Sequence, residues 1–203
     1  MSDADPRDRL DAEKIQAALA NQRIGARVLV LAETTSTNDI LAQEASRSSA
    51  GLVVFAETQT AARGQYGRRW ESAAHCGLWL SVLLRPKISV NQSARLTELL
   101  AHVIATTIEQ QSGIACAIKP PNDIYASNRK LAGVLVEMRV EASGDYAAIA
   151  GLGINLNHAS EDFPAELRAT AGSVAMIAGR RFDRTDFAIA LLRELEARYF
   201  EKF

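Results

Sequence analysis

Apolar side chains recur at helical spacing in two long segments of the sequence. Over residues 93–111, leucine, valine and isoleucine occupy positions 96, 99, 100, 103, 104 and 108. Residues 184–200 repeat this pattern, and Asp183 directly before them is a suitable N-terminal cap. Such spacing is typical of an amphipathic helix with one buried face. We therefore expect helices over both segments, and shorter helices over residues 11–20 and 40–45.

Short runs of apolar and β-branched residues alternate with polar turns through the middle of the chain. They predict strands over residues 28–31, 52–56, 78–84, 115–118, 131–140 and 146–156. The polar residues 127–129 and 142–145 favour hairpin turns, and therefore antiparallel pairing, between the later strands. Strands clustered in the middle, with helices between and after them, indicate an α+β fold.

Composition and charge describe an ordinary globular protein. The 203 residues are 48% hydrophobic, and 23 Lys and Arg balance 24 Asp and Glu, for a net charge of -1. A near-neutral chain is a poor candidate for coating nucleic acid or an anionic membrane. The polar, acidic start is unlike a signal peptide, and no apolar run approaches the roughly 20 residues that span a bilayer. With only Cys76 and Cys116, far apart, we expect a reducing cytoplasm and neither a disulfide framework nor a zinc site.

The long polar connection over residues 58–77 carries the first candidate chemistry. It lacks a helical period, and connections of this length are usually functional or disordered. Within it, Arg63, Arg68 and Arg69 stand among glycines and are followed by Trp70. Glycines let a ligand approach the backbone closely, and guanidinium groups bind phosphate oxygens in a bidentate manner. A solvated basic loop anchored by a core tryptophan explains the same residues.

Two further segments each contain a lysine. In the first it stands near oxygen atoms that could bind a metal ion, and in the second near a glycine that leaves room for a ligand. Lys119, Asn122 and Asp123 follow an apolar run, and an Asn-Asp pair offers oxygen ligands for Mg²⁺ bridged to phosphates. Lys130 stands at the mouth of an apolar strand, where the small Gly133 leaves room for a ligand. Turn chemistry and a surface lysine are the simple alternatives for these positions.

Other patterns are weaker. Gly151 and Gly153 lie on one face of a predicted strand and precede Asn155, but no third glycine opens a helix as in a dinucleotide-binding fingerprint. Close packing of a neighbour explains them equally well. Residues 35–39 offer hydroxyl and amide groups at a helix start, which suits a polar uncharged ligand or a simple cap. The histidines lack the spacing of known catalytic motifs, so we assign them no role.

In chain order, these segments resemble the catalytic domain of biotin protein ligases, in the biotin/lipoate ligase superfamily. The resemblance is carried by Ser36-Thr37-Asn38, Gln59, the run from Arg63 to Trp70, Lys119 with Pro121-Asn122-Asp123, residues 130–137 and residues 151–155. Each fragment is weak alone, but together in this order they are specific. The resemblance implies a fold like that of class II aminoacyl-tRNA synthetases, with a mixed, largely antiparallel central sheet and flanking helices. It places the catalytic domain at residues 28–203, after an N-terminal extension of residues 1–27 with a short helix.

The same resemblance implies an ATP-dependent, AMP-forming ligase. Biotin and MgATP give biotinyl-5′-AMP and pyrophosphate, and biotin then passes to a lysine of the biotin carboxyl carrier domain of acetyl-CoA carboxylase. Both reactants of the first step are anionic, so the site needs fixed cations and a metal more than a general base. In the second step a neutral lysine attacks, and Asp123 is a candidate acceptor of its proton.

The resemblance also implies roles for individual residues. Catalytic roles fall to Arg63, Lys119, Lys130 and Asp123, and Asp123 is also a weak candidate ligand for phosphate-bound Mg²⁺. Biotin binding is expected from Ser36, Thr37, Asn38, Gln59, Arg63, Gly64, Gln65, Lys130, Gly133, Gly151 and Gly153. ATP binding is expected from Arg68, Trp70, Asn122, Lys130 and Asn155, with Trp70 stacked on adenine. The loop around residues 63–70 becomes a lid that excludes water from the adenylate.

Some features depart from the family pattern. Ala62 and Gln65 replace a glycine and an arginine of the usual lid, and Pro120 replaces a tryptophan expected in the wall of the biotin pocket. We expect neither the N-terminal winged-helix DNA-binding domain of bifunctional members nor the C-terminal SH3-like domain of most members.

The expected protein is a monofunctional cytoplasmic enzyme, a monomer or weak homodimer, without nucleic-acid or membrane partners. The alternatives are a lipoate or octanoate ligase or transferase, a non-catalytic binder of biotin or adenylate, and a nucleic-acid-binding module.

Overall fold

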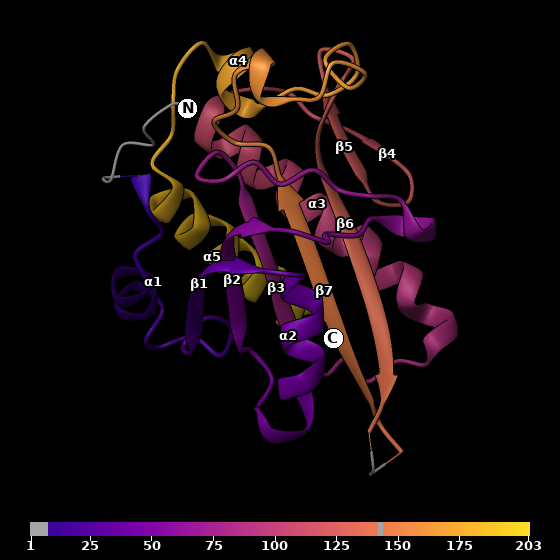
Figure 1. The fold of residues 1–203 in the computed structure, drawn as a ribbon. Coiled ribbons are helices and arrows are strands. Elements are labelled where there is room, and N and C mark those ends of the chain that lie inside the picture. The colour runs from indigo at the N-terminus through magenta and orange to yellow at the C-terminus, as the bar shows by residue number, and fades with distance from the viewer. Residues whose placement is uncertain (1–7, 142–143) are drawn as a thin grey trace.

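A seven-stranded sheet forms the centre of the computed structural model, which describes residues 8–141 and 144–203 (Figure 1). The strands are β1 (Val28–Thr34), β2 (Val53–Gln59), β3 (Leu78–Leu84), β4 (Ala117–Lys119), β5 (Asp123–Ala126), β6 (Arg129–Val140) and β7 (Tyr146–Ile154). They lie in the order β1-β2-β3-β7-β6-β5-β4. Only β1 and β2 pair in parallel among these strands, and the other neighbours are antiparallel. The predicted mixed, largely antiparallel α+β fold is therefore confirmed.

The predicted helices are also present. The structure has α1 (Ala12–Ala18), α2 (Thr37–Glu44), α3 (Ser93–Ser112), α4 (Val174–Ala178) and α5 (Arg184–Lys202). The Asp183 side chain caps α5 by accepting a hydrogen bond from the Asp186 backbone N–H at 2.7 Å, as predicted. Helix α2 begins earlier than predicted, and α4 was not predicted. Within the described parts of the chain, no helix is long and apolar enough to cross a membrane.

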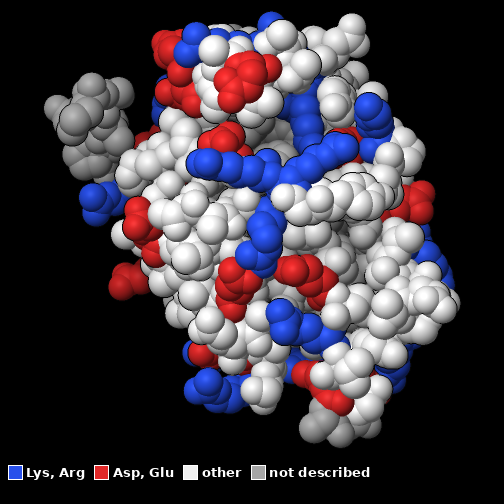
Figure 2. All heavy atoms as spheres, turned by 45° about the vertical axis from the view of Figure 1, so that its right-hand side comes forward, with Lys and Arg blue, Asp and Glu red and all other residues white. Residues whose placement is uncertain are grey.

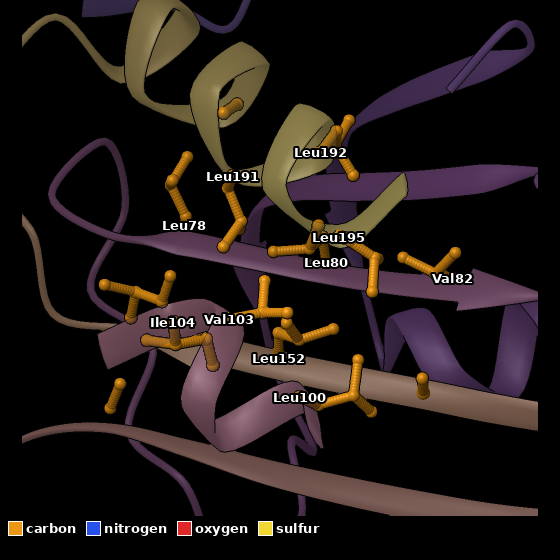
Figure 3. Close-up of a cluster of buried hydrophobic side chains, with 14 of the residues drawn as sticks. Leu78, Leu80, Val82, Leu100, Val103, Ile104, Leu152, Leu191, Leu192 and Leu195 are labelled. Atoms are coloured by element: carbon orange, nitrogen blue, oxygen red, sulfur yellow. The ribbon is translucent and has the colours of Figure 1, made fainter. Parts of the chain in front are cut away.

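Alternation along the buried strand β3 divides its side chains between two faces of the sheet. Leu78, Leu80 and Val82 face the main core, where α3 and α5 cover the sheet (Figure 3). The same cluster contains Leu100, Val103 and Ile104 of α3, Leu152 of β7, and Leu191, Leu192 and Leu195 of α5. The amphipathic faces predicted for both long helices thus meet on one side of the sheet.

The opposite face carries the shorter helix α2. Leu41 of α2 packs there with Leu83 and Ile149 of the sheet. Beyond the N-terminus of α2, Ser81 of β3 stands opposite Gly151 of β7 in register. Small residues at these positions leave room for the Asn38 side chain of α2, since a Cβ added to Gly151 would lie 2.5 Å from Asn38 Oδ1.

Three hairpins follow α3, and the strand β5 that the first two share was not predicted. The four-residue strand β5 pairs with both β4 and β6, although its start reads as turn chemistry in the sequence. The predicted turn between β5 and β6 is confirmed, since Ser127 and Asn128 have positive φ values of 48° and 59°. The predicted turn over residues 142–145 falls partly outside the described residues, because positions 142 and 143 are not described.

The segment before β1 packs against the same core. Ile15, Leu19 and Ile24 are buried in it. The fully buried Arg184 pairs with Glu57 at 2.7 Å, and Glu57 also accepts a hydrogen bond from the Leu10 backbone N–H at 2.8 Å. Residues 8–27 are therefore built into the fold of the sheet that follows them.

Candidate active site

A pocket lies between the N-terminus of α2, the loop after β2, and strands β6 and β7. Fifteen predicted site residues line it, namely Ser36, Thr37, Asn38, Gln59, Arg63, Gly64, Gln65, Arg68, Trp70, Asn122, Asp123, Lys130, Gly133, Gly151 and Gly153. These positions are spread over more than one hundred residues of sequence. The fold brings them together at one place.

The first turn of α2 is capped in an unusual way. Ser36 occupies the N-cap position but makes no cap hydrogen bond with its side chain. Instead, the Thr37 backbone N–H donates to Gln59 Oε1 of β2 at 2.8 Å. A free N–H at a helix start needs an acceptor, and Gln59 supplies it. The simple alternative of a serine cap does not explain Ser36, whose buried hydroxyl remains at the pocket wall.

A buried polar network connects α2 to the sheet. Asn38 Nδ2 donates to Glu137 Oε2 of β6 at 2.6 Å, while Ser81 Oγ lies 2.5 Å from Asn38 Oδ1 and 2.7 Å from Thr37 Oγ1. Ser81 was not predicted as a site residue. Its signal in the sequence was a single polar residue inside the apolar run 78–84. The network fixes the position of the α2 N-terminus over the sheet.

The loop after β2 folds as a hairpin over the pocket. The Trp70 backbone N–H donates to the Ala62 carbonyl at 3.0 Å, and the Gly64 N–H donates to the Arg68 carbonyl at 2.7 Å. Gly67 has a φ of 71°, which only glycine adopts readily. Ala62 is buried at the base of the hairpin, so the structure accommodates its methyl group where the family pattern has glycine.

Arg63 is held by acidic side chains on the pocket rim. Its guanidinium makes a bidentate pair with Asp39 of α2 at 2.6 and 3.0 Å, and lies 3.9 Å from Glu137. This hydrogen bonding lowers the pKa of the Asp39 carboxyl below its ordinary value and raises the pKa of Arg63. The Arg63 guanidinium is therefore already oriented when an anionic ligand enters. The ligand must compete with the Asp39 carboxylate for this guanidinium.

Lys130 and Trp70 form the other side of the pocket. Lys130 Nζ lies 2.6 Å from Asp123 Oδ1 and 5.3 Å from the centre of the Trp70 ring. The same ring covers the two strand glycines, since a Cβ added to Gly153 would lie 2.8 Å from it and one added to Gly133 3.1 Å. The glycines thus allow the tryptophan to lie flat against the strands.

Two predicted residues lie outside this pocket. Lys119 is exposed on β4, with Nζ 5.9 Å from the centre of the Tyr125 ring, so its placement does not support a catalytic role. Asn155 is buried behind Lys130 and donates to the Gly172 carbonyl at 3.0 Å. It lines a neighbouring pocket that shares Trp70 and Lys130 with the first.

Pro120 also lies outside the pocket. It is exposed and does not line the cavity. Pro120 therefore does not supply the wall of the pocket that the family pattern assigns to a tryptophan at this position.

The charges of the site fit an anionic ligand. Figure 2 shows a band of basic side chains across one face, beside a hollow and next to a group of acidic side chains. Within the described residues, no group of three His, Cys, Asp or Glu side chains is arranged to hold a metal ion. Asn122 donates through Nδ2 to the Val134 carbonyl at 3.1 Å, which leaves its amide oxygen and the Asp123 carboxylate as oxygen ligands for a hard cation.

Comparison with known proteins defines the class. The profile of the Biotin/lipoate A/B protein ligase family matches residues 30–155. The chain belongs to this family.

Individual relatives narrow the likeness to biotin ligases. The chain is 36% identical to the bifunctional ligase/repressor BirA of Bacillus subtilis, over 94% of this chain and 59% of BirA. It is 34% identical to the biotin--[acetyl-CoA-carboxylase] ligase of Mycobacterium tuberculosis, over 95% of this chain and 73% of that protein. The structure of the biotin protein ligase from Aquifex aeolicus in complex with biotin and ATP matches with a TM-score of 0.75 at 30% identity, over 86% of this chain and 71% of that chain.

Proposed function

We propose that this protein activates biotin with ATP to give biotinyl-5′-AMP and transfers biotin to a lysine of a biotin carboxyl carrier protein. The observation that carries the proposal is one pocket lined by Arg63, Lys130 and the polar start of α2. The relative from Aquifex aeolicus, whose solved complex holds biotin and ATP, supports it. The chain spans 59% of the length of the BirA relatives, so the activity of the whole enzyme is part of the proposal.

The first step joins two anions. A carboxylate oxygen of biotin attacks the α-phosphorus of ATP, and the bond from that phosphorus to the bridging oxygen of the β-phosphate breaks as pyrophosphate leaves. Arg63 and Lys130 offset the negative charge that collects around the α-phosphorus. Both cations have carboxylate partners in the structure, Asp39 for Arg63 and Asp123 for Lys130. Each cation must therefore release its partner when it binds the substrate.

The biotin end of the pocket is uncharged and polar. We assign the ureido ring to Ser36, Thr37 and Gln59, since hydroxyl and amide groups can both donate to and accept from it. Gly64 and Gln65 close over the ligand from the lid. Asn38 supports this end indirectly, because its side chain is held by Ser81 and Glu137 and packs against Gly151.

The adenylate end lies around Trp70. We assign Trp70 to stacking on adenine, Arg68 and Asn122 to the phosphates, and Asn155 to the neighbouring pocket behind Lys130. Mg²⁺, which neutralises polyphosphate charge when bound, would be held by Asp123 and Asn122 together with phosphate oxygens and water.

The second step transfers the acyl group. The neutral amine of the acceptor lysine attacks the acyl carbon, the bond to the phosphate oxygen breaks, and AMP leaves while Asp123 accepts the amine proton.

We propose a carrier domain of acetyl-CoA carboxylase as the acceptor, as the name of the Mycobacterium tuberculosis relative indicates. We also propose a monofunctional enzyme, a monomer or weak homodimer, in the cytoplasm, where the free thiols of Cys76 and Cys116 would persist.

Pyrophosphate release tests the first step. The protein is incubated with MgATP and either biotin or lipoate, and pyrophosphate is measured over time. We expect release with biotin and a much slower response with lipoate or octanoate. Release with lipoate alone would contradict the proposal, and tight biotin binding without release would point to a non-catalytic binder.

A further inference from the structure

A second pocket lies at the other end of the sheet. It is lined by residues 22–24, 26–27, 48–52, 84–85 and 199–200, at the start of β2, the end of β3 and the C-terminal part of α5. Its volume is about 610 Å³, within the range of small-molecule sites. Strand β2 runs from this pocket to Gln59 of the active site, and at about 3.3 Å per residue its length separates the two by roughly 20 Å. The two pockets are therefore distinct.

The pocket carries positive charge that is not neutralised. Arg85 is held by Glu141 at 2.7 Å and by the Ala45 carbonyl at 2.8 Å. Arg23 and Arg27 have no ion pair within the described parts of the chain, and the Arg23 guanidinium lies 4.6 Å from the centre of the Phe200 ring. Two exposed guanidinium groups thus border the pocket in a protein whose net charge is -1.

Two buried polar atoms in the pocket lack protein partners. Ser48 is 8% exposed, and its hydroxyl makes no hydrogen bond with the described residues. The buried Oε1 atom of Gln22 is also unpartnered among them. Buried polar groups are nearly always paired, so the Ser48 hydroxyl is available to hydrogen-bond a ligand in the pocket that Arg23 and Arg27 also line.

Most of the remaining lining is apolar, and Ser49 is the exception. Ile24, Leu52, Leu84 and Tyr199 border the cavity but are buried, and the exposed large apolar side chain of the lining is Phe200, which is 42% exposed. An inorganic anion would leave this surface uncovered, whereas an apolar molecule would leave the guanidinium groups and Ser48 unpaired. A ligand that has both an anionic group and an apolar body matches the pocket.

We propose that this pocket binds an amphipathic organic anion, a phosphate monoester or carboxylate on a short apolar body. The anionic group lies between Arg23 and Arg27 and accepts a hydrogen bond from Ser48 Oγ. The apolar body packs on the exposed ring of Phe200. A free metabolite and a lipid both present this chemistry.

Calorimetric titration with hexyl phosphate tests the site. We expect saturable binding, weakened about tenfold or more by Arg27→Ala, since a lost charge-assisted hydrogen bond has an effect of this size. Ser48→Ala is also expected to weaken binding. Arg95→Ala, which removes an exposed arginine from α3, serves as the matched control and leaves binding unchanged. An unchanged melting temperature shows that Arg27→Ala remains folded.

Further ligands and one active-site variant complete the test. Inorganic phosphate and hexanol should each bind more weakly than hexyl phosphate. Lys130→Ala must leave hexyl phosphate binding intact, because Lys130 lines a separate cationic pocket, the candidate active site. Vesicles containing phosphatidylglycerol that compete with hexyl phosphate would identify a lipid source, and no competition would identify a free metabolite. The proposal is overturned by absence of saturable binding, by binding that survives Arg27→Ala, or by binding that Lys130→Ala abolishes.

Discussion

Lys130 shows how one side chain connects the parts of the candidate site. It pairs with Asp123 on the neighbouring strand, lies over the Trp70 ring, and borders both the main pocket and the pocket that contains Asn155. In the proposed reaction, a cation at this junction would contact the carboxylate of biotin and the phosphate of the adenylate together. Its partner Asp123 would then be free for the proposed second step.

Replacing Lys130 by alanine should abolish adenylate formation without unfolding the protein. The side chain is about a third exposed, and such ion pairs contribute roughly 1 kcal/mol or less to stability. We expect loss of pyrophosphate release in Lys130→Ala with a nearly unchanged melting temperature. Lys87→Ala, at an exposed position after β3, is the matched control and should keep full activity. Normal pyrophosphate release by Lys130→Ala would refute the role.

The sequence predicted most of the charged and glycine residues of the site, but not the side chains that hold them. Ser36, Gln59, Arg63 and Lys130 belong to local motifs that can be recognised in the sequence. Ser81 does not, because its role depends on the register that places β3 beneath α2. The exposure of Lys119 likewise follows from the path of the β4–β5 hairpin.

At the scale of elements, the strand glycines and the lid form one unit. The Trp70 ring at the end of the lid lies against β6 and β7, and only residues without a side chain leave room for it. The absence of a Cβ at Gly133 and Gly153 therefore positions the proposed adenine platform.

Gly153→Ala tests this arrangement. A Cβ would lie 2.8 to 3.0 Å from three atoms of the Trp70 indole, so the ring must move. We expect the KM for ATP to rise about tenfold, since stacking on an aromatic ring contributes roughly 1–3 kcal/mol per base. Biotin affinity should change less. If the clash with Trp70 causes this rise, adding Trp70→Phe to Gly153→Ala should raise the KM for ATP little further. An unchanged KM for ATP in Gly153→Ala would contradict the assignment.

The elements that were missed share a physical cause. Strand β5 has four residues and begins directly after a proline-rich turn, so it lacks a period that marks a strand. Helix α4 has five residues, fewer than two turns. Strand β5 is stabilised by pairing with β4 and β6 on either side of it, and α4 by backbone hydrogen bonds to the Asn155 and Leu156 carbonyls. The long helices α3 and α5 were predicted almost to the residue because their own apolar faces define them.

At the scale of the whole molecule, stability depends on a buried histidine outside the site. His158 is stacked on Phe163 and packs edge-on against Trp79. Burial lowers its pKa from 6.5 to about 4, with a further lowering by Arg184 and an opposing effect of Asp162. The unfolded chain therefore binds a proton that the folded protein does not bind between about pH 6.5 and pH 4. Acidification through this window destabilises the fold.

We expect the free energy of unfolding to fall by about 2 kcal/mol between pH 7 and pH 5 from this group. Urea denaturation at both pH values measures the change. His158→Phe keeps an aromatic ring and should lose most of this pH dependence. His102→Gln, at an exposed position of α3, should retain it. If the free energy of unfolding changes equally between the two pH values in the parent protein and in His158→Phe, His158 is not the source of the pH dependence.

The whole fold presents one end of the sheet to the proposed substrates. The lid, the start of α2 and the β5–β6 hairpin meet there, although they are far apart in the sequence. Membership of the Biotin/lipoate A/B protein ligase family agrees with this arrangement, and the relative from Aquifex aeolicus has been solved in complex with biotin and ATP. The central claim is that this end performs both adenylation and transfer.

Mass spectrometry of a biotin carrier domain after incubation with the protein tests this claim most directly. With biotin and MgATP, we predict that the carrier gains one biotinyl group on its acceptor lysine. The gain should be absent without ATP and absent with Lys130→Ala. A carrier that an established biotin ligase modifies but this protein leaves unchanged, or that gains a lipoyl group instead, would contradict the account.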